Sequence, residues 1–440
     1  MRQRRAAHDA GGPVKRVVLI AACAFAALML FVWLQNFTSG ADVDDNVPAN
    51  PPSAAEVTRG AYIARAGNCA TCHTDRGAAE FAGGRPLETP FGTVFSSNLT
   101  PDADTGLGRW SPSQFWRALH YGRSRDGRLL YPAFPYTHYT KVSRADSDAL
   151  FDFLRSLTPV RKPNRAHELR WPYSTQAALA VWRTLYFRPG VYEEDTEHSP
   201  QWNRGAYLVE GLGHCGACHT ARNALGATSR DLMDLSGGLI PMQNWYAPAL
   251  TSPSEAGVRD WSDEEVVRLL QAGASPRATV LGPMAEVVEH STQYLEAGDL
   301  KAMAVFLKAL PVTPGASEVD PREVPRASEA VVERGAKLYA DHCARCHAER
   351  GEGVRGAYPA LAGNRAVLLP ITANLVQVVL FGGFAPATQL DPRPFGMPPY
   401  ALQLSDADVA AVLTFVRSSW GNRAAPVTEF DVARQRGTSQ

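Results

Sequence analysis

The sequence has no surplus of charge of either sign, because its 440 residues include 44 Lys and Arg and 44 Asp and Glu. A balanced chain lacks the basic surface that nucleic acid would require, so no nucleic-acid partner is expected. The sequence also lacks sustained alternation of polar and apolar residues, which predicts very little β-strand. With 45% hydrophobic and 20% charged residues it is typical of folded domains, and its length suggests about three of them.

Long apolar runs are absent except for one near the start of the chain. This run extends from Val17 to Leu34, with basic residues before it and acidic residues after it. It is just long enough to cross a bilayer core, and it exceeds the roughly 7–15 apolar residues of a cleaved signal. Because the basic flank stays in the cytoplasm, the rest of the chain is exported. We predict that residues 1–41 form a membrane anchor with one transmembrane helix; cleavage near Ser39–Ala41 is the alternative.

Cysteine is scarce, and its placement is uneven. Six of the seven cysteines form three C-x-x-C pairs, each followed at once by histidine. The seventh, Cys23, lies inside the apolar run, and we interpret it as part of the membrane helix rather than as a lipoprotein processing site. The three motifs are Cys69, Cys72 and His73; Cys215, Cys218 and His219; and Cys343, Cys346 and His347.

The motif C-x-x-C-H is the attachment signature of c-type haem, in which the histidine becomes the proximal iron ligand. Two intervening residues on one helical turn place both sulfurs on the same haem edge. A zinc site would need four thiolate or imidazole ligands, and disulfides within the pairs would leave the three histidines unexplained. The sequence therefore predicts three covalently bound haem c groups, with His73, His219 and His347 as their proximal iron ligands.

The surroundings of the motifs repeat as well. An Arg-Gly-Ala triplet precedes each cysteine pair, at Arg59, Arg204 and Arg334, and a segment with apolar residues at helical spacing ends each copy. Ser or Asp near the start of these closing segments is an N-cap signal. The pattern predicts an all-α fold, with three tandem class I-like cytochrome c domains after one transmembrane helix. The predicted domains are 57–161, 201–311 and 327–422.

Segments rich in proline or polar residues separate these domains. We predict linkers at 42–56, 162–200 and 312–326, and a polar, frayed tail at 423–440. The second linker contains a short apolar stretch, Ala177–Tyr186, which we expect to form a helix that packs against a neighbour.

Methionine opposite histidine is a common pair of axial iron ligands. Because methionine is rare in this sequence, there are few candidates for the sixth ligand of each iron. Met397 stands in a Gly-Met-Pro-Pro turn and Met284 in a Leu-Gly-Pro-Met stretch, each shortly before a closing helix. We predict Met284 and Met397 as sixth ligands of the second and third haems. Met303, on a closing helix, is expected in the core.

The first haem lacks such a ligand, because no methionine occurs between His73 and Met233. Alignment of the first copy on the second sets Ala133 against Met284, with Phe134 beside it, and neither side chain can bind iron. His138 is the preferred sixth ligand of the first haem; His120 and an open sixth position are the alternatives. We interpret His214, next to a cysteine, as a surface residue.

Several stretches are more specific than the haem motifs: residues 82–92, 98–102, 105–110 and 125–133. With them the chain, from about Val57 to Asn422, resembles the triple-haem cytochrome subunits of membrane-bound bacterial dehydrogenases for alcohol, gluconate or sorbitol. It is also similar to the cytochromes that accompany molybdenum hydroxylases of the aldehyde or nicotinate type. The family often has methionine where this chain has Phe134. This difference favours similarity to the molybdenum branch.

The resemblance implies an electron-transfer subunit rather than a catalytic one, with no catalytic residues of its own. Its partner would be a quinone-, flavin- or molybdenum-dependent dehydrogenase subunit, and its acceptor ubiquinone or a terminal oxidase. Its place would be the periplasmic side of the bacterial inner membrane. Two alternatives stay open: a stand-alone electron carrier, and a haem peroxidase that uses the first haem.

Overall fold

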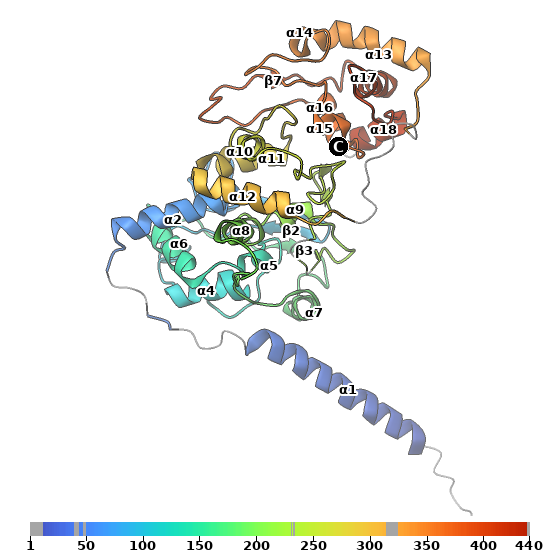
Figure 1. Cartoon of the computed structure of the whole chain (residues 1–440). Helices are drawn as coiled ribbons and strands as arrows, with labels where there is room; N and C mark the ends of the chain where they lie inside the picture. The colour runs from blue at the N-terminus through green and yellow to red at the C-terminus, as the bar shows by residue number, and fades with distance from the viewer. Residues whose placement is uncertain are drawn as a thin grey trace, which may run out of the picture.

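The structure, a computed structural model, describes residues 12–38, 44–46, 50–229, 231, 234–313 and 324–437. Figure 1 shows a body of three helical units, from which a long helix, α1 (Gly12–Phe37), projects. The first unit holds α2 (Ala54–Ala66), α3 (Cys69–His73), α4 (Pro112–Tyr121), α5 (Tyr136–Tyr139) and α6 (Arg144–Ser156). The second holds α8 (Pro200–Ala206), the π-helical turn η1 (Tyr207–Leu212), α9 (Gly216–His219), α10 (Asp263–Ala272), α11 (Pro283–His290), the 3-10 turn η2 (Thr292–Tyr294) and α12 (Ala297–Ala309).

The third unit holds α13 (Glu329–His342), α14 (Ala344–His347), α15 (Arg365–Leu368), α16 (Ala373–Phe381) and α17 (Asp406–Ser418). Besides α1, two described helices lie outside these units: α7 (Gln176–Tyr186) follows the first unit, and α18 (Glu429–Gly437) follows the third. The helix expected between the first two domains is therefore confirmed. Two closing helices also start as predicted, since Ser143 and Ser405 accept hydrogen bonds from the backbone of the first turns of α6 and α17. Helix α12 starts after Glu296, which makes no such bond.

Each unit is built on one crossing between its opening and closing helices: α2 with α6, α8 with α12, and α13 with α17. The glycine of the Arg-Gly-Ala triplet lies at each crossing. A Cβ at this position would lie 1.9 Å from a carbonyl oxygen of the facing helix at Gly60, 2.1 Å at Gly205 and 2.2 Å at Gly335. Because only glycine permits so close an approach of two backbones, the triplet is a packing motif.

The arginine of the same triplet forms an ion pair with an aspartate in the first turn of the closing helix. An aspartate there also interacts favourably with the helix dipole. These contacts give the three crossings the same register. The pairs are Arg59–Asp146 at 2.7 Å, Arg204–Asp299 at 2.6 Å and Arg334–Asp408 at 2.7 Å.

Strands are few and short, as expected. The loop of the first unit forms β1 (Pro86–Thr89) and β2 (Gly92–Phe95), and β3 (Glu168–Leu169), from the segment after α6, completes an antiparallel sheet with them. Two-stranded hairpins stand in the loops of the other units: β4 (Gly238–Ile240) with β5 (Trp245–Ala247), and β6 (Gly383–Phe384) with β7 (Gly396–Met397). The chain is thus mostly helical, with small hairpins inside the long loops.

The first and second units share one hydrophobic core. Ile63 and Phe151 of the first unit belong to the same buried cluster as Leu208 and Phe306 of the second. The third unit has a separate core, which includes Val376, Leu380, Val409 and Leu413. The molecule is therefore a fused pair of units followed by a third.

The contact between the second and third units is largely polar. The Asn374 side chain accepts from the Tyr246 backbone N–H at 2.7 Å and donates to the Tyr246 carbonyl oxygen at 2.7 Å. Gln293 of the second unit donates to the Ala387 carbonyl oxygen at 3.0 Å. These bonds orient the third unit without merging its core with that of its neighbour.

The expectation of a frayed tail was wrong for the described part of it. Helix α18 packs on α16 and α17, and its Val432 is fully buried. Arg436 pairs with Asp406 at 2.7 Å. A short polar helix is stable here because one valine fills the core of the third unit and charged ends bind its surface. Most of the linker predicted at 312–326 lies outside the described residues.

Candidate haem-attachment sites

Each cysteine pair stands on a single helical turn that follows the opening helix. Helix α3 spans Cys69–His73, while Cys215 and Cys343 occupy the N-cap positions of α9 and α14. One turn brings the first and second cysteine of a pair to the same side. Among the described residues, none of the seven cysteines forms a disulfide. Each pair is therefore free to attach a haem.

Each of the three motif histidines makes the same kind of hydrogen bond, from its Nδ1 atom to a backbone carbonyl oxygen. The Nδ1 atom of His73 lies 2.7 Å from the Ser97 carbonyl oxygen, and the corresponding distances are 2.7 Å for His219 to Pro248 and 2.9 Å for His347 to Pro359. A histidine that donates from Nδ1 presents the lone pair of Nε2 to a metal. Burial lowers the pKa of each histidine, which favours the neutral form that binds iron.

The first cysteine of each pair is partly buried, whereas Cys72 and Cys218 are exposed. Burial raises the pKa of Cys69 and of Cys215 to about 12, and the pKa of Cys343 to about 11. A thiol with so high a pKa is a poor nucleophile and a poor redox dithiol. The first cysteine of each pair therefore does not resemble the acidic cysteines of thiol-exchange enzymes.

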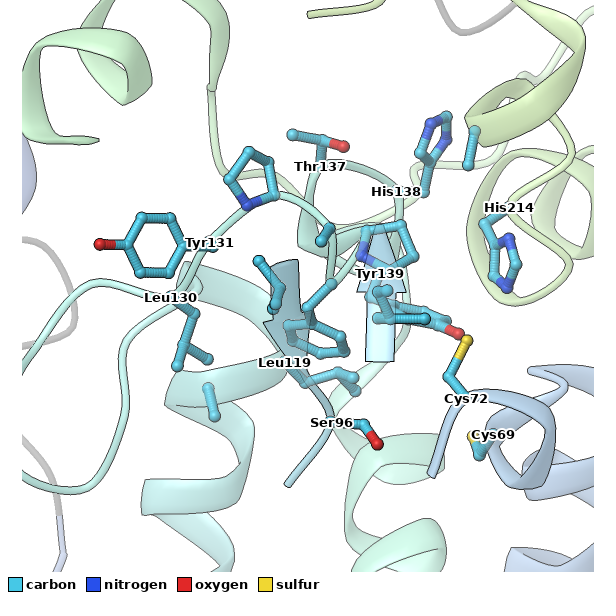
Figure 2. Close-up of a pocket in the computed structure, with 18 of the residues that line it drawn as sticks. Cys69, Cys72, Ser96, Leu119, Leu130, Tyr131, Thr137, His138, Tyr139 and His214 are labelled. Atoms are coloured by element: carbon cyan, nitrogen blue, oxygen red, sulfur yellow. The ribbon is translucent and has the colours of Figure 1, made fainter. Parts of the chain in front are cut away.

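A cavity of about 1090 Å³ contains the first attachment site (Figure 2). Its size matches the upper range of protein pockets for organic ligands and cofactors. Aliphatic and aromatic side chains surround Cys69, Cys72 and His73 there, among them Leu119, Leu130 and Tyr139. An apolar hollow with two thiols and one oriented imidazole fits a covalently attached haem. Over the described part of the chain no group of three or more His, Cys, Asp or Glu could hold a bare metal ion.

The two candidate ligands opposite His73 lie in different places. His138 lines the cavity, is 3% exposed, and has its Nδ1 atom 3.2 Å from the Glu210 carbonyl oxygen of the second unit. In Figure 2 its ring points toward the second unit rather than toward Cys72. His120 is not among the residues that line the cavity, and its ring stacks on Trp116 at 4.4 Å. Phe134 also lines the cavity.

The two methionines predicted as ligands lie beside the cores of their own units. Met284 is the second residue of α11 and packs against the shared core, and Met397 in β7 packs against the core of the third unit. Each is partly buried. Met303 is 3% exposed within α12, in agreement with its expected core role.

Sequence reasoning missed His214. It was expected on the surface, but it lines the same cavity as His73, at a ring distance of 5.3 Å from Tyr139. Cys218 of the second unit lines this cavity too. The cavity therefore joins the first and second attachment turns, and the spacing of the motifs in the sequence carries no signal of this.

The fold and the sites together define a class. A helical crossing followed by a C-x-x-C-H turn, with its imidazole oriented for a metal, is the arrangement of a c-type cytochrome. In agreement, the family model described as cytochrome c matches residues 57–158 and 332–420.

Relatives that match most of the chain identify the family more specifically. The chain is 36% identical over 399 residues to the cytochrome c subunit of the quinone alcohol dehydrogenase of Gluconobacter oxydans, covering 87% of this chain and 82% of that subunit. It is 38% identical over 395 residues to the gluconate 2-dehydrogenase cytochrome c subunit of Pantoea cypripedii, covering 86% and 89%. The chain therefore belongs to the family of dehydrogenase cytochrome c subunits.

A third relative has a different catalytic context. The chain is 40% identical over 379 residues to a nicotinate dehydrogenase subunit of Pseudomonas putida, and the match covers 84% of this chain but 31% of that protein. The chain thus corresponds to a segment of a longer polypeptide in that case.

Proposed function

We propose that this chain is a membrane-anchored cytochrome with three covalent haem c groups, which passes electrons from a dehydrogenase catalytic subunit to ubiquinone or a terminal oxidase. Bound haem supplies one-electron redox chemistry at each of the three sites. The chain's own residues attach it through six cysteines, orient one imidazole per site and exclude water with apolar side chains.

The observation that carries this proposal is the threefold repetition of one site. Each copy has the same crossing, the same attachment turn and the same bond from a motif histidine to a backbone carbonyl. Repetition of a complete attachment site favours a chain of redox centres over a single reactive centre. The relatives, which are cytochrome subunits of dehydrogenases, support a dehydrogenase catalytic subunit as partner.

For the sixth ligands we propose His138, Met284 and Met397, in the order of the three haems. The first choice is supported by the cavity, which His138 lines and His120 does not. The bond of its Nδ1 to a carbonyl oxygen matches that of the proximal histidines and leaves Nε2 without a proton.

An uncleaved anchor is supported by the way α1 ends. The helix has an apolar span from Val14 to Phe37, nearly all of which is exposed. Its last turn docks on the body, where Asn36 is 3% exposed and bonded to α7. A signal segment that is removed from the mature protein would not be expected to form a buried contact with the folded body. We place the body on the periplasmic side of the inner membrane.

The catalytic partner is proposed by class. Relatives are named for alcohol, gluconate and nicotinate dehydrogenases. The presence of Phe134 and the 40% identity to the nicotinate dehydrogenase relative favour a molybdenum-type partner over the quinone and flavin types.

The direct test is the haem count of the purified, denatured chain. The expected mass is that of the mature polypeptide with three haems that acidified organic solvent does not extract. A matched variant, Cys343→Ser with Cys346→Ser, should retain two. Colour that is extracted, or a mass equal to that of the bare polypeptide, would refute covalent attachment.

The relay is tested in membranes that contain the co-purifying dehydrogenase subunit. Addition of the subunit's substrate should reduce the haems, and a ubiquinone analogue should oxidise them again. Rapid hydrogen peroxide turnover by the chain alone, with carbon monoxide bound at one haem, would instead favour the peroxidase alternative.

A further inference from the structure

The outer face of α7 lies beside the attachment point of α1, and we propose that this face rests on the lipid bilayer. Figure 1 shows α7 at the end of the body from which α1 projects. The surface, called the α7 patch below, consists of Trp171, Tyr173, Val181, Leu185 and Leu225. The inference rests on the proposed anchor and adds which side of the body the membrane covers.

The end of α1 is fixed on α7 by a buried network of hydrogen bonds. The Asn36 amide donates to the Ala180 carbonyl oxygen at 3.0 Å and to the Thr184 hydroxyl at 2.9 Å, and it accepts from Arg183 at 2.9 Å. Arg183, which is 4% exposed, also donates to the Tyr121 carbonyl oxygen of the first unit at 2.6 Å. The body therefore cannot swing freely about α1.

The length of α1 sets the depth of this contact. A helix needs about 20 residues to cross the hydrocarbon core, which places the outer boundary near Trp33 when counted from Val14, where the apolar span starts. Asn36 then lies at the level of the lipid headgroups. Because α7 contacts α1 at this turn, α7 lies at the same level. Trp33 is 53% exposed, as is typical of an aromatic residue at a membrane interface.

The α7 patch has the composition of an interfacial surface. Trp171 is 82% exposed, and Val181 and Leu185, four residues apart on the outer face of α7, are 42% and 48% exposed. The opposite face of the helix holds the buried Leu179 and Ala180. A helix with exposed apolar side chains on its outer face, beside a membrane anchor, suits a place in the headgroup region. Trp182 holds the patch together by donating to the Leu225 carbonyl oxygen at 2.9 Å.

Charge favours a bilayer over a basic protein surface as the occupant of this face. No Asp or Glu occurs from residue 169 to 192, although the chain has 44 acidic residues in 440. Arg170 and Arg188 border the patch on either side. A segment without negative charge and with flanking arginines is attracted to anionic lipid headgroups.

The arrangement brings the first attachment site close to the membrane. Trp182, Tyr186 and Phe187 at the end of α7 line the cavity that contains Cys69 and Cys72. One helix, about 10 Å across, therefore separates that cavity from the bilayer surface. The third unit lies at the opposite end of the body (Figure 1). The first unit is thus the one nearest to an acceptor dissolved in lipid.

The test measures the depth of a spin label in the full-length, haem-loaded chain. Leu185→Cys, in a Cys23→Ser background, is labelled with a nitroxide in vesicles of phosphatidylcholine and phosphatidylglycerol, with the haems reduced. Leu402→Cys is the control, because Leu402 is fully exposed in the third unit. Collisions with oxygen relative to an aqueous nickel chelate should be several-fold more frequent at residue 185 than at residue 402. If Leu185→Cys does not assemble, Val181→Cys serves the same comparison.

Equal collision ratios at the two positions would overturn the proposal. So would a label at residue 185 that is exposed to water in vesicles and becomes protected only after the catalytic partner is added. Intact mass and haem content of the same sample separate this outcome from a failure of the proposed function. A chain that keeps α1 and three haems, but has a water-exposed α7 patch, refutes the membrane contact alone.

Discussion

Asp146 and Asp299 each bind two partners that belong to different units. Asp299 pairs with Arg204 of its own unit and accepts a hydrogen bond from Tyr62 of the first at 2.6 Å. Asp146 reciprocally accepts one from Tyr207 of the second unit. The third unit has Lys337 where the others have tyrosine, and Lys337 pairs with Glu333 in its own helix. Two tyrosines therefore join the first two units and leave the third outside.

Asp299 should make this joint sensitive to acid. Burial alone would raise its pKa, but hydrogen bonds from Arg204 and Tyr62 outweigh burial and hold the pKa below that of an ordinary aspartate. Asp299 has a lower pKa in the folded than in the unfolded chain. Its contribution to the stability of the fold is therefore complete above its unfolded pKa and is lost as the pH falls through its folded pKa. Asp299→Asn should lower the free energy of unfolding at neutral pH by about 1–2 kcal/mol, since Arg204 is partly screened by solvent.

Chemical denaturation of the variant and the parent from pH 7 to pH 3 checks this expectation. The difference between them should shrink only below about pH 4. Asp260→Asn is the control, because Asp260 is 60% exposed in its pair with Arg277 and should have almost no effect. A difference that is constant down to pH 3 would contradict the assignment.

His138 can be tested by exchange of the ligand atom. His138→Met should raise the potential of one haem by on the order of 0.1 V, because a thioether opposite histidine favours reduced iron. Redox titration measures the potential, and a near-infrared band detects the new sulfur–iron bond. His120→Met should change neither, since His120 does not line the cavity. Unchanged haem spectra in His138→Met would show that His138 is not the sixth ligand of the first haem.

At the scale of the element, the helix crossings depend on glycine. Gly205→Ala would place a methyl group 2.1 Å from the Ala302 carbonyl oxygen, so α8 and α12 would have to move apart. Overpacking of this kind costs about 1–3 kcal/mol. The fused pair of units should therefore unfold at a lower temperature, and haem incorporation should fall.

Gly298→Ala is the matched control in the same helix pair. Gly298 lies in α12 with no atom within 4 Å of an added Cβ. Alanine there should be neutral or should stabilise the helix by up to about 1 kcal/mol. Equal destabilisation by both substitutions would mean that helix propensity, rather than the close approach of two backbones, sets the requirement for glycine.

At the scale of the whole molecule, the shared core predicts the order of unfolding. The first two units bury one continuous apolar cluster, whereas the third meets the second through polar bonds. Calorimetry of the haem-loaded chain should resolve two transitions, one for the fused pair and one for the third unit. Asn374→Ala, which removes both bonds to Tyr246, should separate them further. A single two-state transition would contradict the division.

The sequence by itself determined the attachment turns, the repeated opening and closing helices and the helix α7. These features depend on neighbours in the chain: the C-x-x-C-H spacing, the N-cap serines and the helical spacing of apolar residues. The packing of α18 could not be predicted in this way, because a polar helix with one buried valine has no distinctive local pattern.

Only the tertiary structure decided how these pieces are combined. It fused the first two units through a shared core, brought His214 and Cys218 into the first cavity, and docked the end of α1 on α7. These contacts join residues far apart in the chain, and their free energy comes from apolar burial and from polar groups that only the folded chain brings into reach. Local spacing carries no record of such partners, so the sequence could predict the attachment sites but not which of them share a cavity.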